Sequence, residues 1–263
     1  MKGISIEGYS FHGLLGEGRM DMFHMLETLQ YRYRVNAVGI WNGFFPSTED
    51  GYVQKIATEL KQRGMILSNL AVDGANVWHD NESKRVQNHE TAKRYLAIAE
   101  KLGAKSVRID WGVPREELAP EEEDLIVRRF REYSNFAHNA GFILCAENHA
   151  GAARNPHFMK RVLEEINHPA YRILLHAGSW YCDTEIGDEI VMPYAAHTHV
   201  MQKVVESARL RELLSLFSKY NYQGYLGVEQ HGGKHEYEVV EWQVATVRKE
   251  LALFSAERIA LNG

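Results

Sequence analysis

Several features that would assign this chain to a class are scarce or missing. Only two cysteines occur, Cys145 and Cys182, and they supply neither a disulfide framework nor a Cys-x-x-Cys metal clip. No run of about eighteen apolar residues is present, and the N-terminal segment MKGISIEGYS lacks the apolar core of a signal peptide. These absences argue against export and against membrane insertion, and we expect a protein of the reducing cytoplasm.

An excess of positive charge is also missing. The 263 residues include 30 Lys and Arg against 35 Asp and Glu, which gives a formal net charge of −5 at pH 7. Binding to a phosphate backbone needs a basic field or a basic patch, so nucleic acid is not an expected partner. The segment YSFHGLLGEG, after the first apolar run, does not match the G-x-G-x-x-G loop of dinucleotide-binding sheets. An open, doubly wound sheet is therefore not expected.

The chain does contain a regular alternation of short apolar runs and amphipathic segments. Strands are predicted at residues 3–6, 36–41, 65–70, 105–110, 142–147, 171–176, 195–200 and 224–229. Helices are predicted at residues 22–33, 49–64, 84–102, 121–141, 156–166, 185–191, 206–220 and 235–254, with residues 9–18 as a glycine-containing loop. Parallel strands need crossover helices, and strand–helix units of about thirty residues are typical of a closed barrel. The sequence therefore predicts an α/β fold in which residues 1–263 form a single (β/α)8 TIM barrel domain.

Four of the apolar runs end in side chains that can bind a metal ion or transfer a proton. They are Glu147 in FILCAENH, His176 in YRILLHAG, His199 in AAHTHV and Glu229 in YLGVEQH. The carboxyl ends of barrel strands form the active face, so these side chains are expected to converge. A carboxylate buried without a partner is costly, so a cation is expected beside the two glutamates. A divalent ion shared with His199 is favoured over ion pairs with Arg108.

Other polar and aromatic residues lie at strand ends or in the loops that follow. Taken alone, His12, His149 and His231 are more consistent with hydrogen-bonded structural histidines than with ligands. Aromatic side chains in such loops can stack on a sugar or pack the loop itself, and the candidates are Trp41, Phe44, Trp78, Trp111 and Trp180. The residues by themselves leave these roles open.

Six segments together resemble one known family over nearly the whole length of the chain. They are YSFHG, NLAVDG, LGAKSVRI, AENH, AHTHV and GYLGVEQHGG. This pattern is similar to that of the xylose isomerase-like (β/α)8 superfamily of sugar isomerases and epimerases. The resemblance implies one divalent metal ion, held at the ends of the fifth to eighth strands by Glu147, His176, His199 and Glu229.

The sixth-strand position departs from the family pattern. This chain has His176, in the segment HAGSW, where the family has an aspartate. Asp183, a little further along the chain, is the alternative ligand, and His176 would then contact the substrate or lie behind the ligands. Two imidazoles and two carboxylates form a softer and less anionic set than the family pattern, which favours Mn, Fe, Co or Zn over Mg.

The resemblance also implies proton transfer at a carbon next to a carbonyl. Glu147 and Glu229 would remove and return the proton, so the expected activity is a divalent-metal-dependent isomerase or epimerase of a ketose, a related keto-sugar or a cyclitol. The residues expected to contact the sugar substrate are His12, Arg108, His149, Trp180 and His231. Relatives commonly assemble, so a homo-oligomer is compatible with the resemblance.

Two alternatives stay open at this point. A lyase, such as a dehydratase or an enzyme that cleaves carbon glycosides, would use the same metal site. The departure at His176 also allows a non-catalytic, sugar-binding barrel. No phosphate-cradling glycine loop is evident, which favours a sugar without a phosphate group as the ligand.

Overall fold

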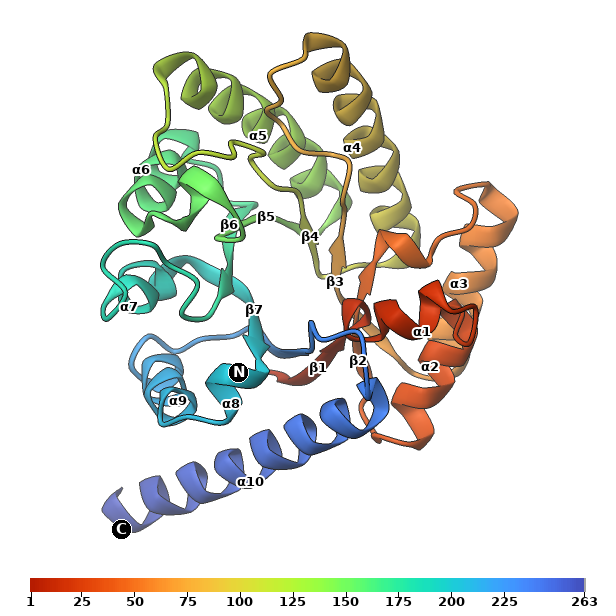
Figure 1. Cartoon of the computed structure of the whole chain (residues 1–263), viewed down its shortest axis with the longest axis vertical. Helices are drawn as coiled ribbons and strands as arrows, with labels where there is room; N and C mark the ends of the chain where they lie inside the picture. The colour runs from red at the N-terminus through yellow and green to blue at the C-terminus, as the bar shows by residue number, and fades with distance from the viewer. Residues whose placement is uncertain (263) are drawn as a thin grey trace.

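Eight parallel strands close into a barrel in the computed structural model, which describes residues 1–262 (Figure 1). The strands are β1 (Gly3–Glu7), β2 (Ala37–Trp41), β3 (Ile66–Ala71), β4 (Ser106–Arg108), β5 (Ile143–Glu147), β6 (Tyr171–His176), β7 (Ala195–Met201) and β8 (Tyr225–Glu229). Each strand pairs with the next one in the sequence, and β8 pairs with β1 to close the ring. Each predicted strand run contains a strand, so the prediction of an α/β fold with a (β/α)8 TIM barrel is confirmed.

Helices surround the barrel, and each predicted helical segment forms one (Figure 1). The α-helices are α1 (His12–Gly16), α2 (Met22–Tyr31), α3 (Asp50–Gln62), α4 (Glu82–Leu102), α5 (Pro120–Ala140), α6 (Pro156–Ile166), α7 (Gly187–Val191), α8 (Gln202–Val205), α9 (Arg209–Lys219) and α10 (Glu236–Asn262). Short 3-10 helices are η1 (Gly8–Phe11), η2 (Asn42–Phe44), η3 (Gly151–Arg154) and η4 (Met192–Tyr194).

Local sequence rules account for several helix ends. The side chain of Asp21 accepts a hydrogen bond from a backbone N–H in the first turn of α2, and Asn155 does the same for α6. Gly103 and Gly141 follow α4 and α5 with φ of 66° and 80°, the left-handed conformation that glycine adopts at low cost. These ends could be predicted because the residues that make them are neighbours in the sequence.

The segment between β1 and α2 differs from the expectation of a loop at residues 9–18. Residues 9–18 contain most of η1 and all of α1. The carboxylate of Glu236, at the start of α10, accepts hydrogen bonds of 2.8 Å from the backbone N–H groups of both Gly13 and Leu14. Because Glu236 lies 223 residues beyond Gly13 in the sequence, no local signal could indicate this helix start.

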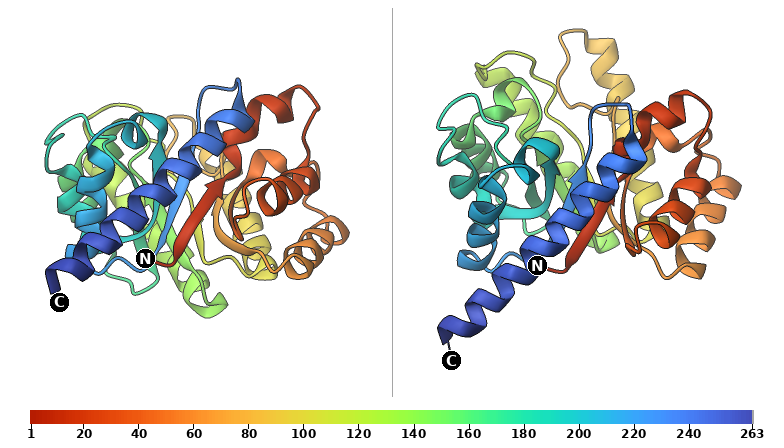
Figure 2. Two further views of the ribbon diagram at one scale, coloured as in Figure 1. Left: turned by 90° about the horizontal axis from the view of Figure 1, so that it is seen from below. Right: turned by 60° about the horizontal axis from the view of Figure 1, so that its bottom comes forward.

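The last helix also differs from the expectation, since α10 continues beyond residue 254 to Asn262. Figure 2 shows α10 running obliquely across the outside of the barrel, with its C-terminal end projecting beyond it. Within residues 1–262, no helix combines the length and the apolar character that crossing a membrane requires.

The inside of the barrel carries small polar side chains. Ser5 on β1 and Ser68 on β3 lie on strands that are not adjacent, yet their hydroxyl oxygens are 2.6 Å apart, which places both inside the barrel. Side chains alternate along a strand, so Glu7 shares the inward face with Ser5. The polar interior therefore continues to the carboxyl ends of the strands.

Candidate metal centre and active site

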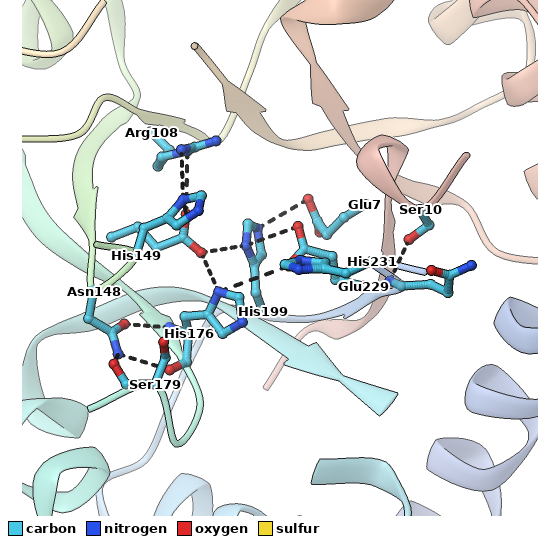
Figure 3. Close-up of polar contacts among 12 residues, drawn as sticks. Glu7, Ser10, Arg108, Asn148, His149, His176, Ser179, His199, Glu229 and His231 are labelled. Atoms are coloured by element: carbon cyan, nitrogen blue, oxygen red, sulfur yellow. Dashed lines mark hydrogen bonds and ion pairs between the residues drawn. The ribbon is translucent and has the colours of Figure 1, made fainter. Parts of the chain in front are cut away.

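Four side chains from adjacent strands meet at the carboxyl end of the barrel (Figure 3). Glu147, His176 and Glu229 end β5, β6 and β8, and His199 lies within β7. Nδ1 of each imidazole lies 2.8 Å from Oε1 of Glu147. Nδ1 of His199 also lies 3.6 Å from Oε1 of Glu229. One donor atom from each residue lies within 4.8 Å of the others, so the structure brings together the four side chains predicted as metal ligands.

The donor atoms suit one divalent ion. Ligands around a tetrahedral ion with bonds of about 2.0–2.2 Å are about 3.3–3.6 Å apart. Here Nδ1 of each imidazole lies 2.8 Å from Oε1 of Glu147, Nδ1 of His199 lies 3.6 Å from Oε1 of Glu229, and one donor atom of each of the four residues lies within 4.8 Å of the others. The four residues are between 2% and 6% exposed, so their donor atoms are turned away from bulk solvent. The residues therefore fit the metal ion that the family resemblance implies.

Neighbouring cationic groups stabilise the charged form of the two buried glutamates. Burial would raise the pKa of Glu147, but the positive charges of His199 and Arg108 hold it well below its usual range. The pKa of Glu229 is lowered against burial in the same way, by His199 and by a hydrogen bond from His231. Burial would lower the pKa of His199, but the carboxylates of Glu229 and Glu147 raise it well above its usual value. The metal-free site thus holds a proton on His199 that a bound cation would replace.

The two candidates for the sixth-strand ligand lie in different places. His176 lies in the cluster, whereas Asp183 is exposed and pairs with His157 at 3.0 Å. Asn148 holds His176: its Oδ1 accepts a hydrogen bond from the His176 backbone N–H at 2.6 Å, and its Nδ2 donates to the His176 carbonyl at 2.9 Å (Figure 3). The geometry therefore favours His176 over Asp183 as the ligand.

A cavity of about 150 Å³ opens onto the four-residue cluster, and two further histidines lie in its wall. Nδ1 of His149 lies 3.5 Å from Oε2 of Glu147. Nε2 of His231 lies 2.8 Å from Oε2 of Glu229. Each glutamate is thus followed, two residues later, by a histidine that contacts its second oxygen. Both histidines were predicted to contact the substrate, and the structure places both where a bound molecule could reach them.

Arg108 also lines the cavity, as expected for a substrate contact, but its guanidinium is already paired. Nη2 lies 3.1 Å from Oδ1 of Asp73, and Nη1 contacts Asp110. Nε lies 3.5 Å from Oε2 of Glu147. Three carboxylates therefore share one positive charge, which fixes the orientation of Arg108.

Two predicted substrate contacts lie outside the cavity wall. Trp180 is 3% exposed, and its indole N–H donates to Asp188 at 2.7 Å, so its ring packs the segment between β6 and α7. His12 stacks on Tyr9 with ring centroids 4.4 Å apart, and its Nδ1 lies 2.8 Å from the Tyr9 carbonyl oxygen. Tyr9 itself lines the cavity, so His12 lies behind a wall residue. A strand-end or loop position in the sequence does not reveal which way a ring turns.

Other residues of the cavity were not selected from the sequence. Glu7 ends β1 and is 2% exposed, with Oε1 2.9 Å from Nε2 of His197. Burial would raise the pKa of Glu7, but the two nearby histidines lower it to about 2. Asp73, in the loop after β3, accepts a hydrogen bond from the Trp41 indole at 2.8 Å. The apolar run GISIE also ends in a carboxylate, so the strand-end pattern that indicated Glu147 and Glu229 could have indicated Glu7.

Comparison with known proteins agrees with this architecture. A family model for the xylose isomerase-like TIM barrel matches residues 30–254. The chain belongs to this family. The resemblance stated from the sequence motifs is therefore confirmed. No curated protein matches this xylose isomerase-like barrel by sequence.

Solved structures that are similar to this xylose isomerase-like barrel include enzymes and a zinc-containing protein. L-ribulose 3-epimerase has a TM-score of 0.82 and 10% identity, over 100% of this chain and 99% of that one. The IOLI protein with a bound zinc atom has a TM-score of 0.76 and 14% identity, over 98% and 99%. The probable 3-DHS dehydratase AsbF of Bacillus anthracis has a TM-score of 0.70 and 12% identity, over 94% and 99%. At identities of 10–14%, these structural matches establish a shared fold alone.

Proposed function

We propose that this protein is a divalent-metal-dependent isomerase or epimerase that moves a proton at a carbon next to the carbonyl of a ketose, a related keto-sugar or a cyclitol. The observation that carries the proposal is the position of Glu147 and Glu229. Their Oε1 atoms lie 2.8 and 3.6 Å from the same nitrogen, Nδ1 of His199, beside one cavity. Similarity in fold to L-ribulose 3-epimerase and to a zinc-containing protein supports it.

Each glutamate has one oxygen at the ligand cluster and one at the cavity wall. In Glu147 and Glu229 alike, Oε1 faces His199, and Oε2 contacts a histidine of the wall. Glu147, His176, His199 and Glu229 would hold the divalent ion, which would supply a Lewis acid for a substrate carbonyl and so acidify the neighbouring C–H. The mixed set of imidazoles and carboxylates favours Mn, Fe, Co or Zn over Mg for this role.

The two carboxylates are the proton acceptor and donor of the proposed reaction. One of them removes the proton from the carbon next to the carbonyl, and the electron pair of that C–H bond becomes part of an enediolate. Return of a proton to the opposite face of the same carbon inverts it, which is epimerisation. Return to the adjacent carbon moves the carbonyl, which is isomerisation. In the proposed complex His149 and His231 hold substrate hydroxyl groups, and the exposure of their side chains, 49% and 40%, supports this role.

The charge of the cavity wall supports a neutral sugar as the substrate. Carboxylates of Glu7, Asp73, Glu147 and Glu229 line the cavity, and the guanidinium of Arg108 is already paired with three acids. A phosphate group would meet no unpaired guanidinium or ammonium group among the residues that line this cavity. The remaining wall includes aromatic rings that suit the apolar face of a sugar, those of Tyr9 and Trp41.

Solvent isotope exchange tests the proposed reaction directly. The protein is stripped of metal, reloaded separately with Mn, Co, Zn, Fe and Mg, and incubated with a panel of free ketoses and keto-sugars in heavy water. We expect deuterium at the carbon next to the carbonyl in at least one sugar, with chelator-treated protein as the control. Absence of exchange with every sugar in the metal-loaded protein would contradict the proposal.

A lyase is the second candidate, and one observation favours it. The carboxylate of Glu147 raises the pKa of His149 to about 9, so His149 carries a proton at neutral pH. A protonated imidazole beside the proton-accepting glutamate can protonate a departing hydroxyl group or aglycone. Similarity in fold to a probable dehydratase is consistent with this reaction. Product analysis separates the two, because a lyase yields water or a released aglycone and an isomerase conserves the substrate mass.

A further inference from the structure

A buried carboxylate, that of Glu7, lies beside the proposed metal centre in the cavity wall, and the proposed reaction does not use it. Glu7 ends β1, while His197 and His199 are alternate residues of β7, so both histidines are on one face of that strand. Oε1 of Glu7 lies 2.9 Å from Nε2 of His197. Oε2 of Glu7 lies 3.4 Å from Nε2 of His199, and Figure 3 shows the Glu7 and His199 side chains facing each other. All three residues are at most 2% exposed. The carboxylate therefore contacts the side of His199 that faces away from the ligand cluster.

Two glycines make room for the Glu7 carboxylate. Gly39 is the register partner of Glu7 on β2, and Gly227 is the register partner of His199 on β8. A Cβ atom at Gly39 would collide with the Glu7 carboxylate. A Cβ atom at Gly227 would lie 2.5 Å from Oε1 of Glu7 and 3.0 Å from Nε2 of His197. Strands on both sides of β1 thus lack side chains at the points where the carboxylate needs the space.

The two ring nitrogens of His199 consequently face different carboxylates. Its Nδ1 lies among the donor atoms, 2.8 Å from Oε1 of Glu147, and its Nε2 points toward Glu7. When Nδ1 binds a metal ion, Nε2 must carry the ring proton, and a carboxylate next to that N–H fixes the tautomer and makes the imidazole a stronger donor. Within the described residues Nε2 makes no hydrogen bond, and Oε2 of Glu7, 3.4 Å away, is the carboxylate oxygen positioned to accept one from it. An ionised carboxylate only accepts hydrogen bonds, so His197 donates from Nε2 and anchors Glu7.

We propose that Glu7 is a positioning residue of the metal centre, which orients His199 through Nε2 and strengthens metal binding, and that His197 anchors Glu7. The inference rests on the metal centre of the proposed function. It does not depend on the identity of the substrate or on the reaction.

The first test is the variant Glu7→Gln, which removes the charge with little change in size. We expect its Co²⁺ and Zn²⁺ affinity to fall about 10- to 100-fold, measured by competition with a chromophoric chelator, because loss of such a partner has this effect in metal sites. The visible absorption spectrum of bound Co²⁺ should also change. The control is Glu122→Gln, since Glu122 is fully buried at the start of α5 and accepts a hydrogen bond from the Ala119 backbone N–H outside the ligand cluster. Its metal affinity and Co²⁺ spectrum should match those of the unaltered protein.

Two further variants separate positioning from general damage to the fold. Gly39→Ala keeps Glu7 but occupies its space, and His197→Asn keeps Glu7 but removes its anchor. Both should weaken metal binding in the same direction as Glu7→Gln, and Glu7→Asp should restore part of the affinity. Each variant is first melted in chelator, and affinities are compared at a temperature where it is folded. If Glu7→Gln does not fold, His197→Asn carries the comparison.

Three outcomes test the positioning role of Glu7. Unchanged affinity and an unchanged Co²⁺ spectrum in Glu7→Gln overturn the proposal, even if activity is lost. Two ions per chain, with one lost in Glu7→Gln, also overturn it, because Glu7 would then be a ligand. Weakened binding together with no isotope exchange on any sugar supports the positioning role and counts against the proposed reaction alone.

Discussion

The side-chain amide of Asn148 bridges the backbone N–H and carbonyl of His176, with distances of 2.6 and 2.9 Å. Asn148 directly follows Glu147 at the end of β5, and His176 ends β6. The bridge therefore connects two neighbouring strand ends and fixes two of the four predicted ligands relative to each other. Both residues are buried, so water cannot replace these hydrogen bonds.

Replacement of Asn148 by alanine should lower both stability and metal affinity. It leaves the buried N–H of His176 without its partner, while the His176 carbonyl keeps the hydrogen bond from the Ser179 backbone N–H, so the free energy of unfolding should fall by about 1–3 kcal/mol. Urea denaturation in chelator measures this change. The control is Asn88→Ala, which removes a partly buried hydrogen bond to the Asn76 carbonyl that involves none of the four predicted ligands. An Asn148→Ala protein as stable as the control would show that the bridge contributes little.

The variants Glu147→Gln and Glu229→Gln should lose isotope exchange. Each removes both a negative ligand and a proton acceptor, so we expect a fall of at least about 10²-fold in exchange rate. Metal content by elemental analysis and sugar binding by calorimetry are measured on the same samples. If neither the unaltered protein nor any variant exchanges protons while sugar affinity persists in all, the barrel is a binding protein and not an enzyme.

The variant His176→Asp restores the donor set of the family pattern and should change the metal preference. It exchanges a neutral nitrogen donor for an anionic oxygen donor, which favours harder ions. We expect the ratio of Mg²⁺ to Co²⁺ affinity to rise by about tenfold or more, measured by competition titration. Asp183→Ala is the control, because Asp183 pairs with His157 at the surface and should not affect metal binding. Loss of the metal in Asp183→Ala would instead identify Asp183 as the ligand.

Metal binding should release a proton and strengthen as pH rises. In the metal-free protein the carboxylates of Glu229 and Glu147 overcome burial and raise the pKa of His199 well above 6.5, so the ion must displace a proton at neutral pH. Affinity should therefore increase up to about tenfold per pH unit until the pH exceeds the raised pKa.

Protonation of His199 also stabilises the metal-free fold, so the free energy of unfolding of that fold should decrease as pH rises. Its contribution to stability is fully present below pH 6.5 and is lost as pH rises through the raised pKa of His199.

Calorimetric titration in two buffers of different ionisation enthalpy counts the protons released on metal binding. Metal affinity that stays constant between about pH 6 and 8 would argue against a protonated His199 in the metal-free site.

Much of the fold follows from local sequence patterns. The apolar runs of β1 to β8 and the capping residues Asp21 and Asn155 act over a few neighbours, so strands and helices could be placed from the sequence. The start of α1 could not, because Glu236 provides its capping carboxylate from the other end of the chain. Local patterns do not report contacts made across the closing seam of the barrel.

The candidate site shows the same division. Glu147, His199 and Glu229 follow or lie within apolar strand runs, so the sequence alone indicated that they face the active end. Only the tertiary structure could distinguish His176 from Asp183 as the sixth-strand ligand, because a short loop can turn a side chain toward the site or toward solvent. The same is true of Trp180, whose ring packs against Asp188 and not into the cavity.

The sequence by itself determined the barrel, its order of strands and the residue types at the strand ends, because alternation along a strand and helical periodicity are short-range properties. Only the tertiary structure decided which of those ends share a contact. Glu7 and His199 are far apart in the chain, and their side chains come within 3.4 Å because ring closure places β1 beside β8, whose other neighbour is β7 with His199. Gly39 and Gly227 leave room for the carboxylate between these strands.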